Sequence, residues 1–453
     1  MPYDYLKGWE INPKAPASSL EAKIAYVDNG TAQVDPARYY DDDTKNLEWN
    51  RLWTRSWLIA CVESDIPEDG DYSVFKLLNE QILIVRQSDH SVRAFYNVCP
   101  HRGNRLIEND RGFVGQFSCP FHSWKFDLDG SLQNITDEET FRPEVVSHRP
   151  GLMEVRVETY CGLVFINLDP NPPPLTDRIG LPQGYLEAYE LDKMRVVRHT
   201  VSEWNANWKT AIDAFYETYH LHAVHPETQG VMVDIGVQFD LYPHGASRMI
   251  VPIGKKSPRI EDQESVDEGL RYMLSSEGID PEGYGGDAHA VRPSIAASKR
   301  QRAKTVGLNY DHFTDGQLTD SWATGIFPNV QIGCHPEGAF LMRFMPHPTE
   351  PERFFYDTMT LFRPADDPSH QAPDWMGIPA ETDLSGNTRP DTEYTATGEA
   401  ANLGLVLDQD AHLLPIVQQG IKSRGFNGPL WGEQEQRLRH FHVELDRYLS
   451  GEK

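Results

Sequence analysis

Two short loops that combine cysteine with histidine constrain this chain more than any other feature of its sequence. The first loop reads Cys99-Pro-His101-Arg-Gly, and the second reads Cys119-Pro-Phe-His122-Ser-Trp124. Two cysteines and two histidines would suit a tetrahedral zinc ion. Zinc fingers, however, pair cysteine with cysteine and histidine with histidine along the chain, whereas each loop here supplies one of each. This order favours a site in which one metal ion takes both thiolates and a second takes both imidazoles.

That division of ligands is typical of a Rieske [2Fe–2S] cluster, in which two histidines bind one iron and raise the reduction potential. The loops resemble those of Rieske ring-hydroxylating oxygenases at nearly every position, since the proline after each cysteine, Gly103 and Trp124 match as well. The resemblance implies a catalytic α subunit in which four residues bind the cluster: Cys99, His101, Cys119 and His122. Such a cluster transfers only single electrons, so the remainder of the chain must distinguish an enzyme from an electron carrier.

A second candidate site lies at 203–226, which reads EWNANWKTAIDAFYETYHLHAVHP. Apolar residues recur at spacings of four and three from Trp204 to Tyr219, and this pattern predicts an amphipathic helix. Three polar residues fall on the opposite face of that helix: Asp213, Glu217 and His220. The segment therefore presents an acid and a histidine together.

The end of this segment decides whether a second histidine can join the first. Pro226 is expected to end the helix, which would place His225 on the departing turn. An undistorted helix would not point His220 and His225 the same way, but a break before Pro226 could. Two histidines and one carboxylate leave three positions on Fe(II) open, where O2 and a substrate can meet. From the spacing alone, a solvated helix face with unrelated histidines is an equally good interpretation.

The family resemblance extends to this segment. Family members carry Asn-Trp-Lys, then an Asn or Asp, an acid two residues before Tyr-His, and a second His five residues after the first. The matching residues here are Asn207-Trp208-Lys209, Asp213, Glu217, Tyr219-His220 and His225. The match implies that His220 and His225 are iron ligands, with His222 as the rival, and that Glu217 and Asp213 act at the catalytic site. Glu217 departs from the Asp that is common at its position.

The resemblance also implies a third iron ligand, a carboxylate on a late helix, eight residues before a glutamine. The sequence Leu-Asp408-Gln-Asp410-Ala-His precedes Val-Gln418-Gln-Gly, so this spacing selects Asp410. Asp408 is the competing candidate. Either acid could instead cap the start of the helix.

Strand and turn patterns indicate how the chain is divided. Gln81–Arg86 and Val92–Val98 flank the polar turn Ser88-Asp89-His90 and predict a hairpin. A further strand pattern over Val155–Leu168 is followed by Pro172-Pro173-Pro174, which cannot continue a ladder. We therefore expect three parts: 1–55 as the N-terminal part of the catalytic domain, 56–172 as the Rieske domain, and 173–453 as the catalytic iron domain.

The resemblance implies an α+β fold, with the all-β Rieske domain inserted into a helix-grip catalytic domain, an antiparallel sheet around a long helix. The charged, glycine-rich stretch from 255 to 317 is expected to cover the site. Phe215 and 322–345 are candidates for the substrate pocket, although most of these residues are expected to form ordinary sheet core.

Charge and composition limit the classes of molecule that the protein is expected to bind. A net charge of −26 should repel nucleic acid and anionic lipid, and makes a locally basic protein partner more plausible, although it could simply keep the protein soluble. The chain contains no run of 18 apolar residues, so no membrane span is predicted, and the N-terminus lacks the features of a signal peptide. We therefore expect a cytoplasmic protein. Its five cysteines are too few for a disulfide framework.

The resemblance implies a terminal oxygenase that binds a [2Fe–2S] cluster and mononuclear Fe(II) and uses O2 to hydroxylate an aromatic or other hydrophobic ring. The chain has no G-x-G-x-x-G fingerprint, so NAD(P)H is expected to act only through a partner reductase or ferredoxin. A homotrimer or α3β3 assembly is also implied, in which Glu217 links its own His220 to His122 of a neighbour. The alternatives are an O- or N-demethylating Rieske monooxygenase and, in another class, an electron-transfer protein without oxygenase chemistry.

Overall fold

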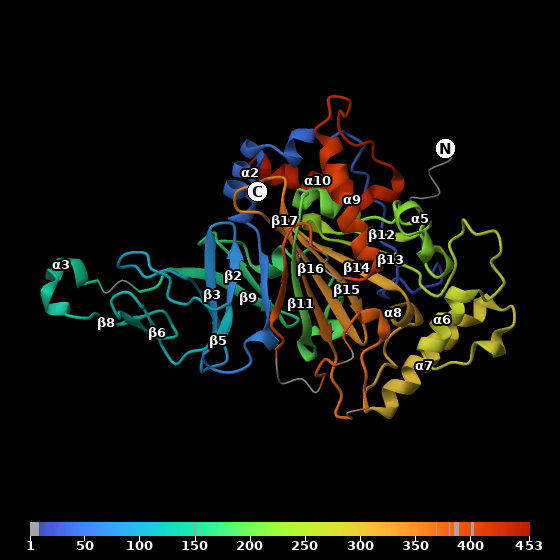
Figure 1. The fold of residues 1–453 in the computed structure, drawn as a ribbon, viewed down its shortest axis with the longest axis horizontal. Helices are drawn as coiled ribbons and strands as arrows, with labels where there is room; N and C mark the ends of the chain where they lie inside the picture. The colour runs from blue at the N-terminus through green and yellow to red at the C-terminus, as the bar shows by residue number, and fades with distance from the viewer. Residues whose placement is uncertain (1–8, 149–150, 368, 380, 385–388, 400–402) are drawn as a thin grey trace. The chain divides into compact units, whose positions relative to one another are not determined.

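The computed structural model describes residues 9–148, 151–367, 369–379, 381–384, 389–399 and 403–453. The predicted absence of a signal peptide rests on residues 1–16, of which 1–8 lie outside the described residues. The chain divides into two compact units (Figure 1). One unit is formed by the chain up to Glu48 together with Ile179–Lys453, and the other by Trp49–Arg178.

The unit over Trp49–Arg178 extends beyond the expected 56–172 at both ends. At its start, the carbonyl of Arg55 accepts a hydrogen bond from the side-chain amide of Asn167 at 3.2 Å. At its end, the carbonyl of Pro173 accepts a hydrogen bond from the Trp57 indole at 2.9 Å. Packing at both ends therefore holds residues in this unit that the strand pattern does not mark.

Antiparallel strands build this unit. The larger sheet has seven strands in the order β1-β10-β9-β4-β3-β2-β5. Their bounds are β1 Leu58–Val62, β2 Asp71–Leu77, β3 Glu80–Arg86, β4 Val92–Tyr96, β5 Arg111–Phe113, β9 Glu154–Tyr160 and β10 Leu163–Asn167. A small sheet joins β6 (Phe117–Ser118), β7 (Lys125–Phe126) and β8 (Leu132–Asn134). The cysteine loops follow β4 and β6 and therefore leave from the ends of strands.

The strands of this unit test two predictions from the sequence, the hairpin over 81–98 and the strand over Val155–Leu168. The predicted hairpin is confirmed, because β3 pairs with β4 and Arg86 lies opposite Val92. The pattern over Val155–Leu168 proves to be two strands, β9 and β10, joined by a tight turn. The turn residues Cys161 and Gly162 have φ values of 51° and 76°, as hairpin turns that match the strand twist require.

The other unit is built on an eight-stranded sheet in the order β12-β13-β14-β15-β16-β17-β11-β18. Every pairing in it is antiparallel except that of β11 with β18. The bounds are β11 Arg195–Trp204, β12 Gln238–Leu241, β13 Ser247–Val251, β14 Ser321–Ile326, β15 Val330–His335, β16 Gly338–Pro346, β17 Phe354–Phe362 and β18 Thr392–Thr395. Together with its helices, this sheet gives the α+β architecture that the resemblance implies.

The helices of this unit include two beside the candidate iron site, α4 (Trp208–Phe215) and α9 (Leu405–Ile421), and a third, α10 (Gln436–Leu449), that is joined to α4 by a contact between His442 and Asp213. Helix α4 packs on both β16 and α9. The helix α2 (Asp42–Glu48) brings the N-terminal part of the chain to the same unit. In the described part of the chain, no helix combines the length and apolar character needed to cross a bilayer.

The stretch from 255 to 317 contains two helices, α6 (Glu268–Ser276) and α7 (Val291–Thr305). Much of the remainder consists of irregular turns. It has a small core of its own, made by Leu270, Leu274, Val291 and Ile295. Helix α6 contacts the turn η8 (Pro226–Gly230), which directly follows His225. The stretch is thus anchored beside the candidate iron site, and a covering role stays a prediction.

Candidate metal centres

The helix predicted from Trp204 to Tyr219 is confirmed only over Trp208–Phe215, and the prediction is wrong at both ends. Trp204 is the last residue of β11 and pairs with Phe354 of β17. Helix α4 begins at Trp208 because the Asn207 side chain caps it, accepting a 2.9 Å hydrogen bond from the backbone N–H of Lys209. Tyr219 is 51% exposed. The apolar spacing therefore ran through a strand end, a helix and a turn.

A break over 216–220 separates α4 from the short helix α5 (Leu221–Val224). The Glu217 carboxylate occupies the break and accepts hydrogen bonds from the backbone N–H groups of Tyr219 and His220. His220 and His225 are the residues that flank α5 at its two ends. His225 leaves the helical path before Pro226 with φ −124° and ψ 56°, as the sequence predicts.

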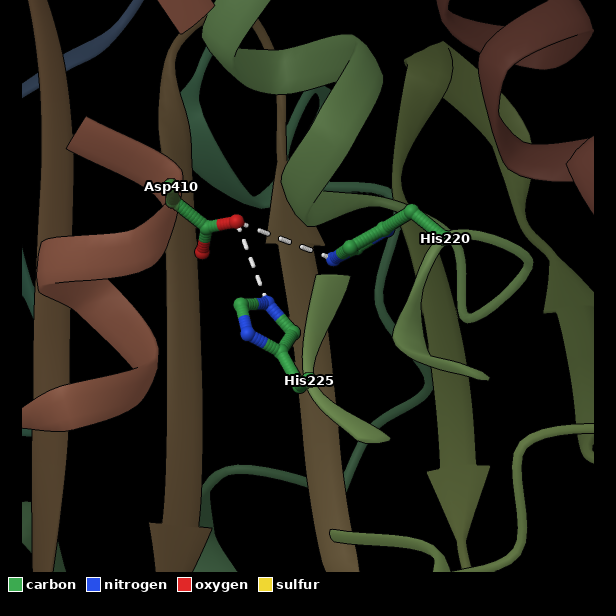
Figure 2. A group of neighbouring side chains, drawn as sticks. All are labelled: His220, His225 and Asp410. Carbon is green, nitrogen blue, oxygen red and sulfur yellow. Dashed lines mark hydrogen bonds and ion pairs between the residues drawn. The ribbon is translucent and has the colours of Figure 1, made fainter. Parts of the chain in front are cut away.

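The structure brings three predicted ligands together: His220, His225 and Asp410 (Figure 2). Oδ1 of Asp410 lies 3.1 Å from Nε2 of His225 and 3.9 Å from Nε2 of His220. The ligand atoms all lie within 4.8 Å of one another, and atoms bound about 2 Å from one ion lie about 3–4 Å apart. The set fits the facial triad of a mononuclear Fe(II) ion.

Hydrogen bonds at the Nδ1 atoms fix the orientation of the imidazole rings of His220 and His225. Nδ1 of His220 lies 2.6 Å from Oε1 of Glu217, and Nδ1 of His225 lies 2.6 Å from Oε1 of Gln409. Because a carboxylate and an amide oxygen only accept, both Nδ1 atoms carry the hydrogen. Both Nε2 atoms then turn toward Asp410 with unshared electron pairs. Sequence reasoning missed Gln409, for which the only signal is that it precedes Asp410.

Electrostatics also point to a cation at this position. Burial opposes the charged form of His225, but the hydrogen bonds with Asp410 and Gln409 outweigh it and raise the pKa of His225. An uncharged Nε2 and a carboxylate oxygen would repel each other at 3.1 Å. A proton or a metal ion between them removes that repulsion.

The rival ligands lie elsewhere. Oδ1 of Asp408 accepts a hydrogen bond from the backbone N–H of Leu403 at 3.3 Å, so this acid supports the start of α9. The ring of His222 lies against Tyr219, with the ring centres 5.9 Å apart. Within the described residues, neither side chain belongs to the ligand group. The structure therefore favours Asp410 over Asp408 and His225 over His222.

Asp213 lies in a different network from the ligand group. Its carboxylate accepts a hydrogen bond from the Tyr39 hydroxyl at 2.6 Å and lies 3.0 Å from Nε2 of His442. Arg38 donates to Nδ1 of the same imidazole at 2.9 Å, so Nε2 must carry the hydrogen that reaches Asp213. Asp213 thus joins α4 to α10 and to η1 (Pro36–Tyr39). Among the described residues, Asp213 does not belong to the ligand group, so its implied catalytic role stays a prediction.

Gln418 explains the spacing between the late helix and its ligand. Its amide oxygen accepts hydrogen bonds from the backbone N–H of Asn207 and the Thr210 hydroxyl, both at 2.9 Å. Its amide nitrogen donates to the carbonyl of Tyr39 at 3.0 Å. This buried side chain fixes α9 against the start of α4, about two turns after Asp410. The register that presents Asp410 is therefore set by Gln418.

The two cysteine loops of the other unit share one backbone conformation. The N–H of Cys99 donates to the carbonyl of Asn104, and that of Cys119 donates to the carbonyl of Trp124, both at 2.8 Å. The fifth residue of each loop donates back to the cysteine carbonyl and has a positive φ, 77° at Gly103 and 59° at Ser123. Each loop is therefore a closed turn that presents a cysteine and a histidine.

The chemistry of these loops fits a cluster with two thiolate and two imidazole ligands. Burial raises the pKa of the Cys99 thiol to about 11, so a thiolate there needs a cation beside it. The rings of His101 and His122 lie 4.7 Å apart, and Trp124 stacks on His101 at 4.7 Å. Nδ1 of His122 is buried and has no hydrogen-bond partner among the described residues. All five cysteines of the chain are free thiols.

The predicted pocket residues are mostly buried strand residues. The segment 322–345 supplies β14, β15 and most of β16. Phe215 packs against Phe344 and Tyr356, with ring centres 5.3 Å and 5.4 Å apart. Burial raises the pKa of Tyr356, and the Asp410 carboxylate raises it further. These aromatic rings therefore lie near the candidate iron site.

Two family models match the chain. The model described as "Ring hydroxylating alpha subunit (catalytic domain)" matches residues 191–451, and the "Rieske [2Fe-2S] domain" matches residues 56–156. The first of these covers more than half of the chain.

Curated relatives and solved structures resemble the chain as well. A carnitine monooxygenase oxygenase subunit of Escherichia coli (strain K12) is 35% identical over 212 residues, which are 46% of this chain and 55% of that protein. A glycine betaine monooxygenase oxygenase subunit of Pseudomonas aeruginosa (strain UCBPP-PA14) is 30% identical over 216 residues, 48% of this chain and 50% of that protein. A structure of naphthalene 1,2-dioxygenase with indole bound has a TM-score of 0.64 at 19% identity and covers 95% of this chain and 94% of that one.

These similarities cover different fractions of the chain. The chain spans about half the length of the curated relatives it matches. The solved structure matches nearly the whole chain, and at its low identity it shows the fold alone. Fold, domain types and cofactor-binding chemistry are therefore better defined than the substrate.

Proposed function

Because the chain belongs to the catalytic α subunits of Rieske ring-hydroxylating oxygenases, we propose that it removes a methyl group from a quaternary ammonium compound. The enzyme is a Rieske-type oxygenase with a [2Fe–2S] cluster and a mononuclear iron. The observation that carries the oxygenase chemistry is the convergence of His220, His225 and Asp410. The substrate class is supported by the carnitine and glycine betaine monooxygenases among the relatives.

The aromatic residues beside the site suit such a substrate. Quaternary ammonium groups bind over the faces of aromatic rings, where the ring quadrupole attracts a cation that has no hydrogen to donate. Phe215, which is partly exposed and packs on Tyr356, supplies a ring of this kind, and the Asp410 carboxylate raises the pKa of that tyrosine. The acidic character of the chain also favours a cationic substrate over an anionic one.

The reaction balances as a monooxygenation. One O2, two electrons and two protons convert the N-methyl group to an N-hydroxymethyl group and one water. The hydroxymethyl group then leaves as formaldehyde, with a tertiary amine and a proton. The mononuclear iron, when bound, would supply the activation of O2, and His220, His225 and Asp410 are the residues that would hold it.

The electrons are proposed to arrive through the cluster from a partner reductase or ferredoxin, in a homotrimer or α3β3 assembly. Glu217 is the candidate link between its own His220 and His122 of a neighbouring subunit. Its contact with Nδ1 of His220 at 2.6 Å supports the half of this link that lies within one chain. Glu217→Ala should keep the cluster and some iron but lose turnover, whereas an active variant would contradict the link. Glu217→Gln, which keeps an acceptor for Nδ1, is the matched control.

Ring hydroxylation is the second candidate, since the same aromatic rings would also pack against an aromatic substrate. The fold shared with naphthalene 1,2-dioxygenase is compatible with it. A ring dioxygenase would give a cis-dihydrodiol and release no formaldehyde. The products therefore separate the two candidates.

The test starts from metal content and the EPR spectrum of the reduced protein after Fe(II) reconstitution. About three irons per chain, with the low average g value of a histidine-ligated cluster, are expected. Carnitine, glycine betaine, naphthalene and biphenyl are then compared for O2 uptake in single turnovers driven by dithionite-reduced enzyme. Formaldehyde from a quaternary ammonium compound supports the proposal, and a dihydrodiol overturns its substrate class. Two irons after reconstitution and no O2 uptake would identify an electron carrier.

A further inference from the structure

The two candidate histidine ligands are oriented by different kinds of acceptor. Glu217 holds Nδ1 of His220 with a carboxylate, whereas Gln409 holds Nδ1 of His225 with a neutral amide oxygen. Both contacts are 2.6 Å long. The first acceptor belongs to the segment that carries both histidines, and the second comes from α9.

Helix α9 therefore contacts His225 at both ring nitrogens. Asp410 lies 3.1 Å from Nε2, and its neighbour Gln409 lies 2.6 Å from Nδ1. Successive helical side chains diverge by about 100°, which allows the two to reach opposite sides of one ring. His225 is 0% exposed at its side chain, so water cannot replace Gln409 freely.

The contact with Gln409 selects between two tautomers. With the amide oxygen toward the ring, Nδ1 carries the hydrogen and Nε2 presents a free electron pair to a metal. If the amide nitrogen faced the ring, Nδ1 would have to accept, and the hydrogen on Nε2 would block metal binding. Only the first arrangement is compatible with His225 as a ligand.

We propose that Gln409 is a positioning residue of the iron site, which fixes the His225 tautomer and so presents Nε2 to Fe(II). This inference rests on the proposed ligand set and adds a residue to it. The neutral amide also limits charge at the site, because Asp410 and Glu217 already balance the two charges of Fe(II). A glutamate at 409 would keep the acceptor and add a negative charge.

The experiment measures Fe(II) affinity in the full chain with its cluster intact. Mononuclear iron is removed with a chelator, Fe(II) is returned anaerobically, and bound iron is measured by equilibrium dialysis. Loss of an outer partner of a metal-binding histidine costs about 10–100-fold in metal affinity, and Gln409→Leu is expected to show this loss. Gln409→Glu should bind Fe(II) as tightly as the parent or more tightly. Gln419→Leu, the same change at an exposed position of α9, should leave affinity within about threefold, below that range.

The variants also separate positioning from folding. Gln409→Asn keeps the amide but withdraws it by one methylene, and it is expected to weaken Fe(II) binding like Gln409→Leu at an unchanged melting temperature. Parent-like affinity in both Gln409→Leu and Gln409→Asn would overturn the role of Gln409. A different result bears on the proposed function: a parent protein that binds no Fe(II), or a His225→Ala variant that binds it normally, would remove the iron site itself.

Discussion

The two candidate metal centres are built in opposite ways. In the unit over Trp49–Arg178, four ligands come from two turns within a span of 24 residues, from Cys99 to His122, and each turn closes by its own backbone hydrogen bonds. In the other unit, the ligands come from the ends of α5 and from α9, far apart in the chain. There each imidazole needs a second side chain to orient it.

The difference shows what each centre depends on. The cysteine loops are specified by local backbone conformation, so the cluster ligands should tolerate changes elsewhere in the chain. The iron site depends on how α4, α9 and α2 pack, through side chains such as Gln418 and Lys209 that do not touch the ligands. Changes in distant anchors should therefore disturb the iron site first.

The largest effect is expected from Asp410→Ala. Loss of a ligand should cost more than the about 10–100-fold in affinity that follows loss of an outer partner, so mononuclear iron and turnover should both be lost. The EPR signal of the cluster should persist, since its ligands lie in the other unit. Asp408→Ala is the control, and losing the hydrogen bond that this exposed acid accepts from the backbone N–H of Leu403 should cost only about 0.5–1.5 kcal/mol of stability. Equal loss of iron in both variants would reverse the assignment of the ligand.

The sequence predicted the local centre more completely than the distributed one. The spacing of Cys99, His101, Cys119 and His122 indicated a Rieske cluster because the loop conformation is contained in the motif itself. The helix predicted from Trp204 to Tyr219 began too early, because a strand end can carry the same apolar spacing as a helix, and only pairing with Phe354 shows that Trp204 belongs to a strand.

The remaining residues depend on packing that a single sequence does not contain. The choice of Asp410 over Asp408 came from family spacing, and Gln418 supplies its physical reason by fixing the register of α9. Gln409 could not be found, because its role exists only once His225 lies against α9. The resemblance also attached a catalytic role to Asp213, whose contacts are with Tyr39 and His442.

An intermediate effect is expected from Lys209→Met, which tests the dependence on distant anchors. Nζ of Lys209 lies 2.6 Å from Oε1 of Glu48, and the two side chains are 1% and 2% exposed. Removing one partner leaves a buried charge unpaired, which costs about 3–5 kcal/mol. Denaturant unfolding should show this loss together with weaker Fe(II) binding and an unchanged cluster spectrum.

The control for this variant is Lys304→Met, because the ion pair of Lys304 with Asp311 is about half exposed on both sides. Exposed pairs contribute about 0–1 kcal/mol, so this variant should unfold almost like the parent. If Lys209→Met changed the cluster spectrum as strongly as Fe(II) binding, the proposed separation between the two centres would be wrong.

The smallest effect tests whether the cysteine loops are locally determined. Gly103 and Ser123 occupy equivalent positions with φ values of 77° and 59°, a conformation that costs other residues about 1–2 kcal/mol. A Cβ at Gly103 would meet nothing within 4 Å, so Gly103→Ala should lose about 1 kcal/mol from backbone strain alone. Ser123 is exposed, and Ser123→Gly should be neutral or gain up to about 1 kcal/mol. Denaturant unfolding, monitored by the absorbance of the cluster, measures the stability of both variants. Stability changes of the same sign in the two variants would show that contacts beyond the loops decide the loop conformation.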